Sequence, residues 1–312
     1  MSTGAHSKRP MAPMAACAVI VACLLGACGT LKQVAVDKLG DALASGGDSY
    51  AADADVELVG SASPFGLKLT ESLLAESPRH QGLLLAAARG FTQYAYAFVE
   101  LPADALEKSD VAGSYAARER ARRLYLRARN YGLRGLDAAH PGFSALFEND
   151  PASALASMRA GDAPLLYWTA ASWGAAISLG KDDAAMLAGL APMRRLAKAA
   201  LELDESYSQG AVHVLHMSLA MSEAQPEAQR LASATAHFER AVALSAGLQA
   251  APFVAHAESI CIPSGKREHF DRMLDRALAI DLDAAPSARL SNELFQRRAR
   301  WLRAHAQELF SQ

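Results

Sequence analysis

The sequence predicts an all-α protein built as an array of antiparallel helix pairs. Apolar side chains recur along the chain at the spacing of one helical face. Prolines, glycines and capping residues separate these segments at short intervals. The sequence has no run of alternating apolar residues and no Asn-Gly or Asp-Gly turn signal, so we expect no sheet.

Residues 1–27 are predicted to be a lipoprotein signal peptide. Two basic residues open it, and residues 11–25 form an uncharged segment that is too short for a permanent anchor. Small residues then precede Cys28, whose thiol would accept a diacylglyceryl group and anchor the chain to a membrane without spanning it. The alternative is an ordinary secretory signal with a chance cysteine.

The residues that follow the signal peptide limit where the protein can be located and what it can bind. Gly29 stands where an aspartate would signal retention at the inner membrane, so we expect the periplasmic side of the outer membrane. Removal of residues 1–27 takes away two basic residues and no acid, which changes the formal net charge from −2 to −4 and argues against nucleic-acid binding. Cys261 is then the one remaining unmodified cysteine, so stability must come from core burial and not from a disulfide.

The full sequence is expected to have three parts. They are the signal peptide over 1–27, a lipidated N-terminus and linker with a weak helix over 28–60, and a helical domain over 61–312. Helices are predicted over 67–77, 81–100, 114–137, 143–147, 150–160, 163–180, 192–203, 207–222, 226–245, 251–261, 267–281 and 286–310. Their boundaries rest on turn and breaker residues, in chain order Pro64, Pro78, His140-Pro141-Gly142, Asp162, Pro164, Gly180, Pro192, Pro226, Pro263-Ser264-Gly265 and Pro286.

The segment 163–180 is the centre of this array. It contains no charged residue and is apolar on every side, so lipid or other helices must surround it. Its length would just allow a membrane span. About half of it is small residues that allow close helix approach, which favours a buried helix with the segment 192–203 as its antiparallel partner.

A recurring helix end indicates internal repeats. The sequence pattern of Ala200–Asp204 recurs at Ala241–Ser245, 41 residues later, and again at Ala277–Asp281, a further 36 residues later. These spacings are near the tetratricopeptide period of about 34 residues. We therefore expect degenerate tetratricopeptide-like repeats of the α-solenoid type, although the proline usual after such a pattern is absent at Glu205 and Leu282.

Four stretches resemble the T-component of tripartite ATP-independent periplasmic (TRAP) transporters, the TatT family. They are Asp55-Val56-Glu57-Leu58-Val59 with Pro64-Phe65-Gly66-Leu67-Lys68, residues 83–99 with Gly90-Phe91 and Tyr94-Ala95-Tyr96-Ala97-Phe98, residues 164–179 with Trp168 and Trp173, and Arg289-Leu290-Ser291-Asn292. The resemblance implies a periplasm-facing lipoprotein of tetratricopeptide-like helices that assembles as a homotrimer. It also implies association with the TRAP substrate-binding component and delivery of a hydrophobic or organic-acid solute. The alternative is a scaffold lipoprotein for outer-membrane or envelope assembly.

No catalytic motif is found, so we expect neither an enzyme nor a cofactor. His213 and His216 share a helical face that could seat a metal, but such a site would need further ligands. His256, Cys261 and His269 qualify by residue type alone, and we predict no metal site. A nucleophilic role for Cys261 has no base to support it.

Several side chains are candidates for lining a ligand cleft, each with a packing alternative. The aromatic face that includes Phe91 and Tyr94 is also what a core helix would show. The two tryptophans lie about 140° apart around their helix, so at most one of them faces a cleft. Asn292 either clamps a neighbouring backbone or contacts a ligand. The full set is Phe91, Tyr94, Trp168, Trp173, His213, His216 and Asn292.

The segment 114–137 is rich in arginine, and its function has two possible interpretations. The arginines either form a solvated face whose apolar stems cover neighbouring side chains, or they form a docking patch for an acidic partner or lipid headgroups.

Overall fold

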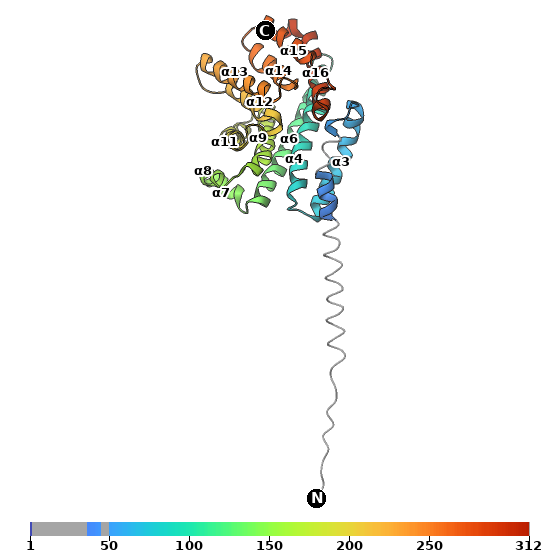
Figure 1. Cartoon of the computed structure of the whole chain (residues 1–312), viewed down its shortest axis with the longest axis vertical. Helices are drawn as coiled ribbons and strands as arrows, with labels where there is room; N and C mark the ends of the chain where they lie inside the picture. The colour runs from blue at the N-terminus through green and yellow to red at the C-terminus, as the bar shows by residue number, and fades with distance from the viewer. Residues whose placement is uncertain (2–35, 45–49, 312) are drawn as a thin grey trace.

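The computed structural model describes residue 1, residues 36–44 and residues 50–311, and within these it is helical with no strand (Figure 1). The all-α prediction is confirmed. The expected signal peptide, the lipidation site Cys28 and the linker around residues 45–49 lie outside the described residues. Residues 36–44 are helical, and Val36 and Leu43 pack against the hydrophobic cluster of the first two long helices.

The first third of the chain contains α3 (Val56–Glu76), α4 (Gln81–Ala95), η1 (Tyr96–Glu100), α5 (Leu101–Leu106) and α6 (Val111–Ala139). Helix α3 starts before the position predicted from Pro64. The Asp55 side chain accepts a hydrogen bond from the Leu58 amide and caps the helix, and Pro64 is accommodated inside it. The expectation that Pro64 leads into the helix was therefore wrong, and Asp55 is the start signal.

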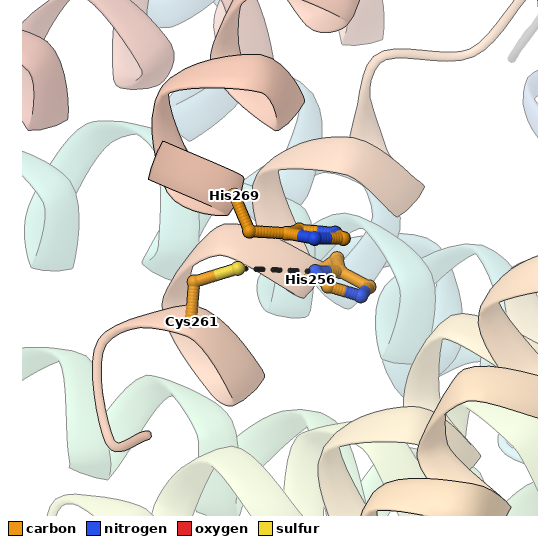
Figure 2. A group of neighbouring side chains, drawn as sticks. All are labelled: His256, Cys261 and His269. Atoms are coloured by element: carbon orange, nitrogen blue, oxygen red, sulfur yellow. Dashed lines mark hydrogen bonds between the residues drawn. The ribbon is translucent and has the colours of Figure 1, made fainter. Parts of the chain in front are cut away.

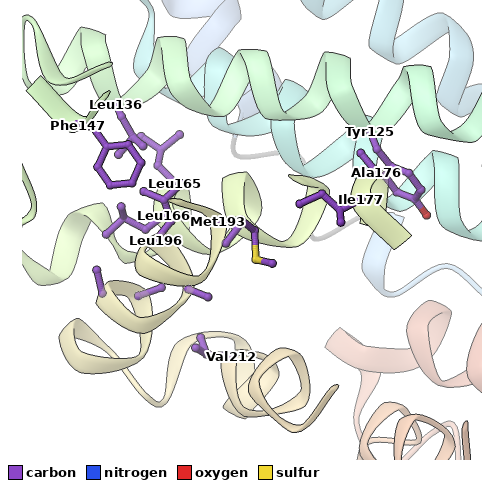
Figure 3. Close-up of a cluster of buried hydrophobic side chains, with 14 of the residues drawn as sticks. Tyr125, Leu136, Phe147, Leu165, Leu166, Ala176, Ile177, Met193, Leu196 and Val212 are labelled. Carbon is purple, nitrogen blue, oxygen red and sulfur yellow. The ribbon is translucent and has the colours of Figure 1, made fainter. Parts of the chain in front are cut away.

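The middle of the chain contains α7 (Phe143–Asn149), α8 (Pro151–Ala156), η2 (Ala160–Asp162), α9 (Ala163–Ser178), α10 (Ala184–Leu187) and α11 (Leu190–Leu203). Helix α9 contacts α4, α6, α11 and α12, so protein surrounds it as expected. Figure 3 shows its side chains Leu165, Leu166 and Ile177 within the cluster that α6 and α11 complete. No helix among the described residues is long and apolar enough to cross a membrane.

The last third contains α12 (Tyr207–Met221), α13 (Glu227–Leu244), α14 (Ala251–His256), η3 (Ala257–Cys261), α15 (Arg267–Leu278), η4 (Pro286–Ala288), α16 (Arg289–Ala304) and α17 (Ala306–Leu309). Helix pairs α12 with α13, α14 with α15 and α15 with α16 lie side by side. Helix α16 also returns to α3, where Arg297 pairs with Glu57 across a separation of 240 residues (Figure 1). Assignment of these pairs to regular tetratricopeptide-like repeats stays a prediction.

Two features interrupt the regular helices. Segments η1 and η3 are π-helical, with hydrogen bonds that skip one more residue than in an α-helix. Ser208, Gln209 and Gly210 at the start of α12 all have left-handed backbone conformations, with φ of 50°, 55° and 89°. Left-handed conformations at non-glycine residues store strain and occur where the surrounding structure holds them in place.

Candidate functional site

Three aromatic side chains meet where α9 contacts α12, and one arginine of α4 lies near enough for its charge to act on one of them. We call them the aromatic group: Tyr167 and Trp168 of α9, Tyr207 of α12 and Arg89 of α4. Pro164 in the first turn of α9 fixes where that helix begins, and the left-handed turn after Tyr207 sets the direction in which α12 leaves. All four side chains are half-buried.

Direct contacts hold the aromatic members together. The Trp168 Nε1–H donates to the Tyr207 hydroxyl at 2.9 Å. The Tyr167 ring lies edge-on to Trp168, with 5.0 Å between centroids, and 5.4 Å from Tyr207. These are the spacings at which aromatic rings attract one another, so the group is pre-organised before any ligand arrives.

Burial raises the pKa of both tyrosines, which keeps their hydroxyl groups protonated and able to donate. At Tyr207 the hydrogen bond from Trp168 and the positive charge of Arg89 act in the opposite direction. Arg89 forms no hydrogen bond or ion pair with any described residue. A half-buried guanidinium without a carboxylate partner, beside apolar rings and protonated hydroxyls, suits a ligand with an apolar body and an acidic group.

A second group, the polar cluster, draws side chains from both π-helical segments. Tyr96 and Glu100 come from η1 and Glu258 from η3, and Asp104, Tyr125 and Arg298 complete it. Arg298 Nη1 donates to Asp104 Oδ2 at 2.6 Å and its Nε donates to Glu258 Oε1 at 2.7 Å. The Tyr125 hydroxyl donates to Glu100. These contacts join helices of the first third to helices of the last.

Burial raises the pKa of Glu100 and of Glu258, and the nearby Arg298 opposes the shift at both. Burial also raises the pKa of Tyr96 and Tyr125. The cluster thus contains three carboxyl groups around one buried guanidinium. Its excess of carboxyl groups makes the cluster a poor binding site for an acidic ligand. Its ion pairs connect helices from the two ends of the chain.

Two surface concavities lie elsewhere. An open groove of about 510 Å³ runs between α8 and α11 and carries Arg195, Lys198 and Glu202 on one wall. A smaller one of about 360 Å³ lies between the start of α4 and the end of α6, lined by Arg79 and Arg134. None of the residues predicted to line a cleft borders either concavity.

The predicted aromatic candidates are divided among different neighbours. Phe91 is buried, stacks on Tyr131 with 5.8 Å between centroids, and has the Arg127 guanidinium over its ring. Tyr94 packs against Phe98 and accepts a hydrogen bond from Arg120. Trp173 lies under Arg129, on a different side of α9 from Trp168.

The arginine-rich segment itself becomes α6, and its arginines mostly serve such internal contacts. The Arg122 and Arg127 side chains pair with Glu119 and Glu71, while Arg129 and Arg134 lie over aromatic rings.

His213 and His216 lie together, as their spacing predicts, and His237 of α13 joins them. His213 Nδ1 is 2.9 Å from His237 Nδ1, and His213 Nε2 is 3.2 Å from Glu205 Oε2. His216 Nε2 donates to the Ala197 carbonyl at 2.9 Å. Since Glu205 accepts from His213 Nε2–H, His213 Nδ1 accepts from His237 Nδ1–H, and the neutral rings form a hydrogen-bonded chain.

Asn292 is 1% exposed, and both ends of its amide bond the backbone before α14. Its Oδ1 accepts from the Ala250 amide and its Nδ2 donates to the Leu248 carbonyl, each at 2.9 Å. The structure therefore places Asn292 as a clamp on this turn, the packing alternative that its sequence position left open.

Sequence reasoning missed Arg89, Tyr207 and His237 as site residues. No local pattern marks them, because each acquires its role from a helix far away in sequence. It also left His256, Cys261 and His269 as separate residues, whereas the structure brings their ligand atoms within 4.8 Å of one another.

Comparisons with known proteins agree with this picture. The family model described as TRAP transporter T-component matches residues 52–310, a span that runs from before α3 to the end of α17. An uncharacterized protein of Treponema pallidum (strain Nichols) is 34% identical over an alignment of 315 residues. The alignment covers 94% of this chain and 97% of the relative. The resemblance drawn from four short stretches is thus confirmed over most of the chain, which belongs to the TRAP transporter T-component family.

Proposed function

We propose that this chain is a non-catalytic lipoprotein subunit of a TRAP-type solute uptake system. It is anchored through Cys28 on the periplasmic side of the outer membrane, binds the TRAP substrate-binding component, and contacts an organic-acid solute through the aromatic group. The family match supports the transporter role. The absence of a catalytic motif in the sequence supports a role without chemistry.

The observation that carries the solute proposal is Arg89. An unpaired charge out of water is costly. The half-buried Arg129, Arg194 and Arg230 each donate to an amide, carbonyl or hydroxyl oxygen in place of a carboxylate. Arg89 has no bonding partner among the described residues, and its positive charge acts on Tyr207, which contacts Tyr167 and Trp168. An organic acid would supply the missing carboxylate and would place its apolar part against Tyr167 and Trp168.

The test is native mass spectrometry of the purified chain, first under gentle and then under denaturing conditions. We expect a small acidic molecule to be released on denaturation. Arg89→Gln should lower its occupancy at least tenfold, about 1.4 kcal/mol, while Arg123→Gln, the same change at an exposed arginine of α6, should leave occupancy unchanged. Release of no molecule, or equal occupancy in the two variants, would overturn the solute contact.

Receptor binding is tested separately by co-purification with the cognate TRAP substrate-binding protein. Association supports the transport role, and its repeated absence with a verified cognate receptor favours the envelope-scaffold alternative. The same native spectra report the oligomeric state. Helix α3 leaves Leu58 and Phe65 exposed at 58% and 74%, and a homotrimer interface would cover such side chains.

A further inference from the structure

A group of three potential metal ligands lies at the junction of α14, η3 and α15 (Figure 2). His256 is the last residue of α14, Cys261 is the last residue of η3, and His269 is in the first turn of α15. We call these residues the His-Cys group. It is separate from the aromatic group and does not depend on the proposed function.

The π-helical turn brings two of these residues together. In an α-helix, residues five apart lie about 140° apart around the axis and do not face each other. In η3 the hydrogen bond instead runs from the Ile262 amide to the Ala257 carbonyl, at 3.1 Å, which widens the turn by one residue. As a result His256 Nδ1 lies 3.4 Å from Cys261 Sγ (Figure 2).

The separations are close to those of a bound ion. With bonds of about 2.0 Å to nitrogen and 2.3 Å to sulfur, tetrahedral zinc holds its ligand atoms roughly 3.3–3.8 Å apart. The His256–Cys261 pair is already within this range. All three ligand atoms lie within 4.8 Å of one another, and the two imidazole rings stack with 4.9 Å between centroids. Imidazole lone pairs lie in the ring plane and stacked rings do not point at one common ion, so His269 must turn about its side-chain torsions to complete the site.

His269 supplies an independent sign of a missing partner. Its Nε2 is buried and has no hydrogen-bond partner among the residues that the structure describes. A buried polar atom left in this way costs about 1–3 kcal/mol, so most native structures supply a partner. Its Nδ1 has only a 3.4 Å contact with Arg272, an exposed side chain that is free to move away.

The donors select the type of ion. One thiol and two imidazoles form an N/S set that suits Zn²⁺, whereas Mg²⁺ and Ca²⁺ need oxygen ligands and no described carboxylate joins the group. Imidazole binds a metal in its neutral form, which is the main form of an unperturbed histidine near pH 7.

The thiol behaves differently. Burial raises the pKa of Cys261 to about 11, although the positive charges of Lys266 and Arg272 oppose the shift. A metal would therefore displace the thiol proton: the Zn–S bond forms as the S–H bond breaks, and one proton goes to solvent for each ion bound.

We propose that His256, Cys261 and His269 bind one Zn²⁺ ion, with water in the fourth position, and that the ion ties α14 and η3 to α15. The ion would fix the loop between η3 and α15, and its ligand Cys261 belongs to the hydrophobic cluster of the last helices. Cys261 is fully buried and His256 is 4% exposed, so the ion enters past the half-buried His269.

The test uses the full chain with Cys17, Cys23 and Cys28 replaced by serine, so that Cys261 is the single thiol. Zn²⁺ alone is titrated by isothermal calorimetry, and Co²⁺ is used as a spectroscopic probe. We expect one Zn²⁺ per chain, release of a proton, a thiolate-to-cobalt charge-transfer band, and protection of Cys261 from a thiol reagent.

Two variants and one control complete the experiment. Cys261→Ser should abolish the charge-transfer band, and His269→Gln should weaken Zn²⁺ binding at least about tenfold, as losses at metal sites do. His216→Gln, which removes a histidine outside the His-Cys group, should bind Zn²⁺ as the parent does. Absence of the band in the parent chain, or equal Zn²⁺ affinity in the parent and His269→Gln, would overturn the proposal even if Cys261→Ser fails to fold.

Discussion

At the scale of single residues, Asn292 is the clearest case of a polar side chain that serves the fold. Asn292→Ala would leave the buried Ala250 amide and the Leu248 carbonyl without partners. We expect a loss of about 2–3 kcal/mol in the free energy of unfolding, measured by urea denaturation. Ser291→Ala, at the exposed neighbouring position, should change it by less than about 0.5 kcal/mol. Comparable losses in both variants would contradict the clamp.

The candidate site shows what one sequence can reveal at this scale. Trp168 stands out because a large aromatic residue in an uncharged helix must have a specific neighbour. Arg89 does not, since any exposed helix can carry an arginine and its significance comes from the missing carboxylate beside it. The sequence left Asn292 as either a backbone clamp or a ligand contact, and only its two bonds to the backbone in the structure distinguish these roles.

At the scale of elements, most helices were predicted within a few residues, because prolines and capping side chains fix their ends. The structure places α6, α11, α13 and α16 inside or close to the predicted segments. The π-helical segments were not predicted. Each lies inside a segment expected to be continuous helix, and the extra residue in its turn leaves no mark on apolar periodicity or composition.

The packing of α6 against α9 depends on Gly132. A Cβ at this position would overlap Thr169 Oγ1 and approach the Thr169 Cα to 3.3 Å. Alanine favours a helix over glycine by about 1 kcal/mol, but the overlap should outweigh this. We expect Gly132→Ala to lower the free energy of unfolding by about 1–2 kcal/mol, and Thr169→Ala to restore part of that loss when combined with it.

Gly161 provides the control for this experiment. A Cβ there has no atom within 4 Å, so Gly161→Ala should be close to neutral in the same urea titrations. If the double variant were no more stable than Gly132→Ala alone, contact with Thr169 would not be the cause.

The histidines between α12 and α13 should make stability depend on pH. Burial, with smaller effects of His216 and His213, lowers the pKa of His237 to about 4. The unfolded chain binds this proton near pH 6.5, so between about pH 6.5 and 4 the unfolded state holds more protons than the folded state. The stability that neutral His237 contributes is therefore present above pH 6.5 and is lost as the pH falls.

His237→Gln isolates this effect. The loss of unfolding free energy between pH 7.5 and 4.5 should be smaller in this variant than in the parent, by on the order of 1–2 kcal/mol for a half-buried ring. Thr235→Ala, an exposed change on the same helix, should keep the parent's pH dependence. An unchanged pH dependence in His237→Gln would show that the ring does not titrate as inferred.

At the scale of the whole molecule, the chain joins its last long helix to its first ones. Arg297 of α16 pairs with Glu57 of α3, and Arg298 beside it pairs with Asp104 of α5 and Glu258 of η3. A plain solenoid has contacts only between neighbouring repeats. The link between the ends could not be predicted from the sequence, because no local signal distinguishes these arginines from the others in α16.

Arg298 and Arg297 allow a buried ion pair to be compared with an ion pair at the surface. The Arg298 side chain is 13% exposed and that of Arg297 is 42% exposed. Arg298→Gln would leave Asp104 and Glu258 without their shared cation, and removing one partner of a buried pair costs about 3–5 kcal/mol. Arg297→Gln, the same change one residue away, should cost far less because solvent screens that pair.

The pH dependence of Arg298→Gln adds a second readout. Burial already raises the pKa of Glu258, so this carboxyl group should take up a proton readily once the guanidinium is gone. The loss of unfolding free energy in Arg298→Gln should therefore be larger at pH 7.5 than at pH 5, as measured by urea denaturation at both values. Losses that are small and equal in the two arginine variants would mean that the chain ends are held by apolar packing and not by the polar cluster.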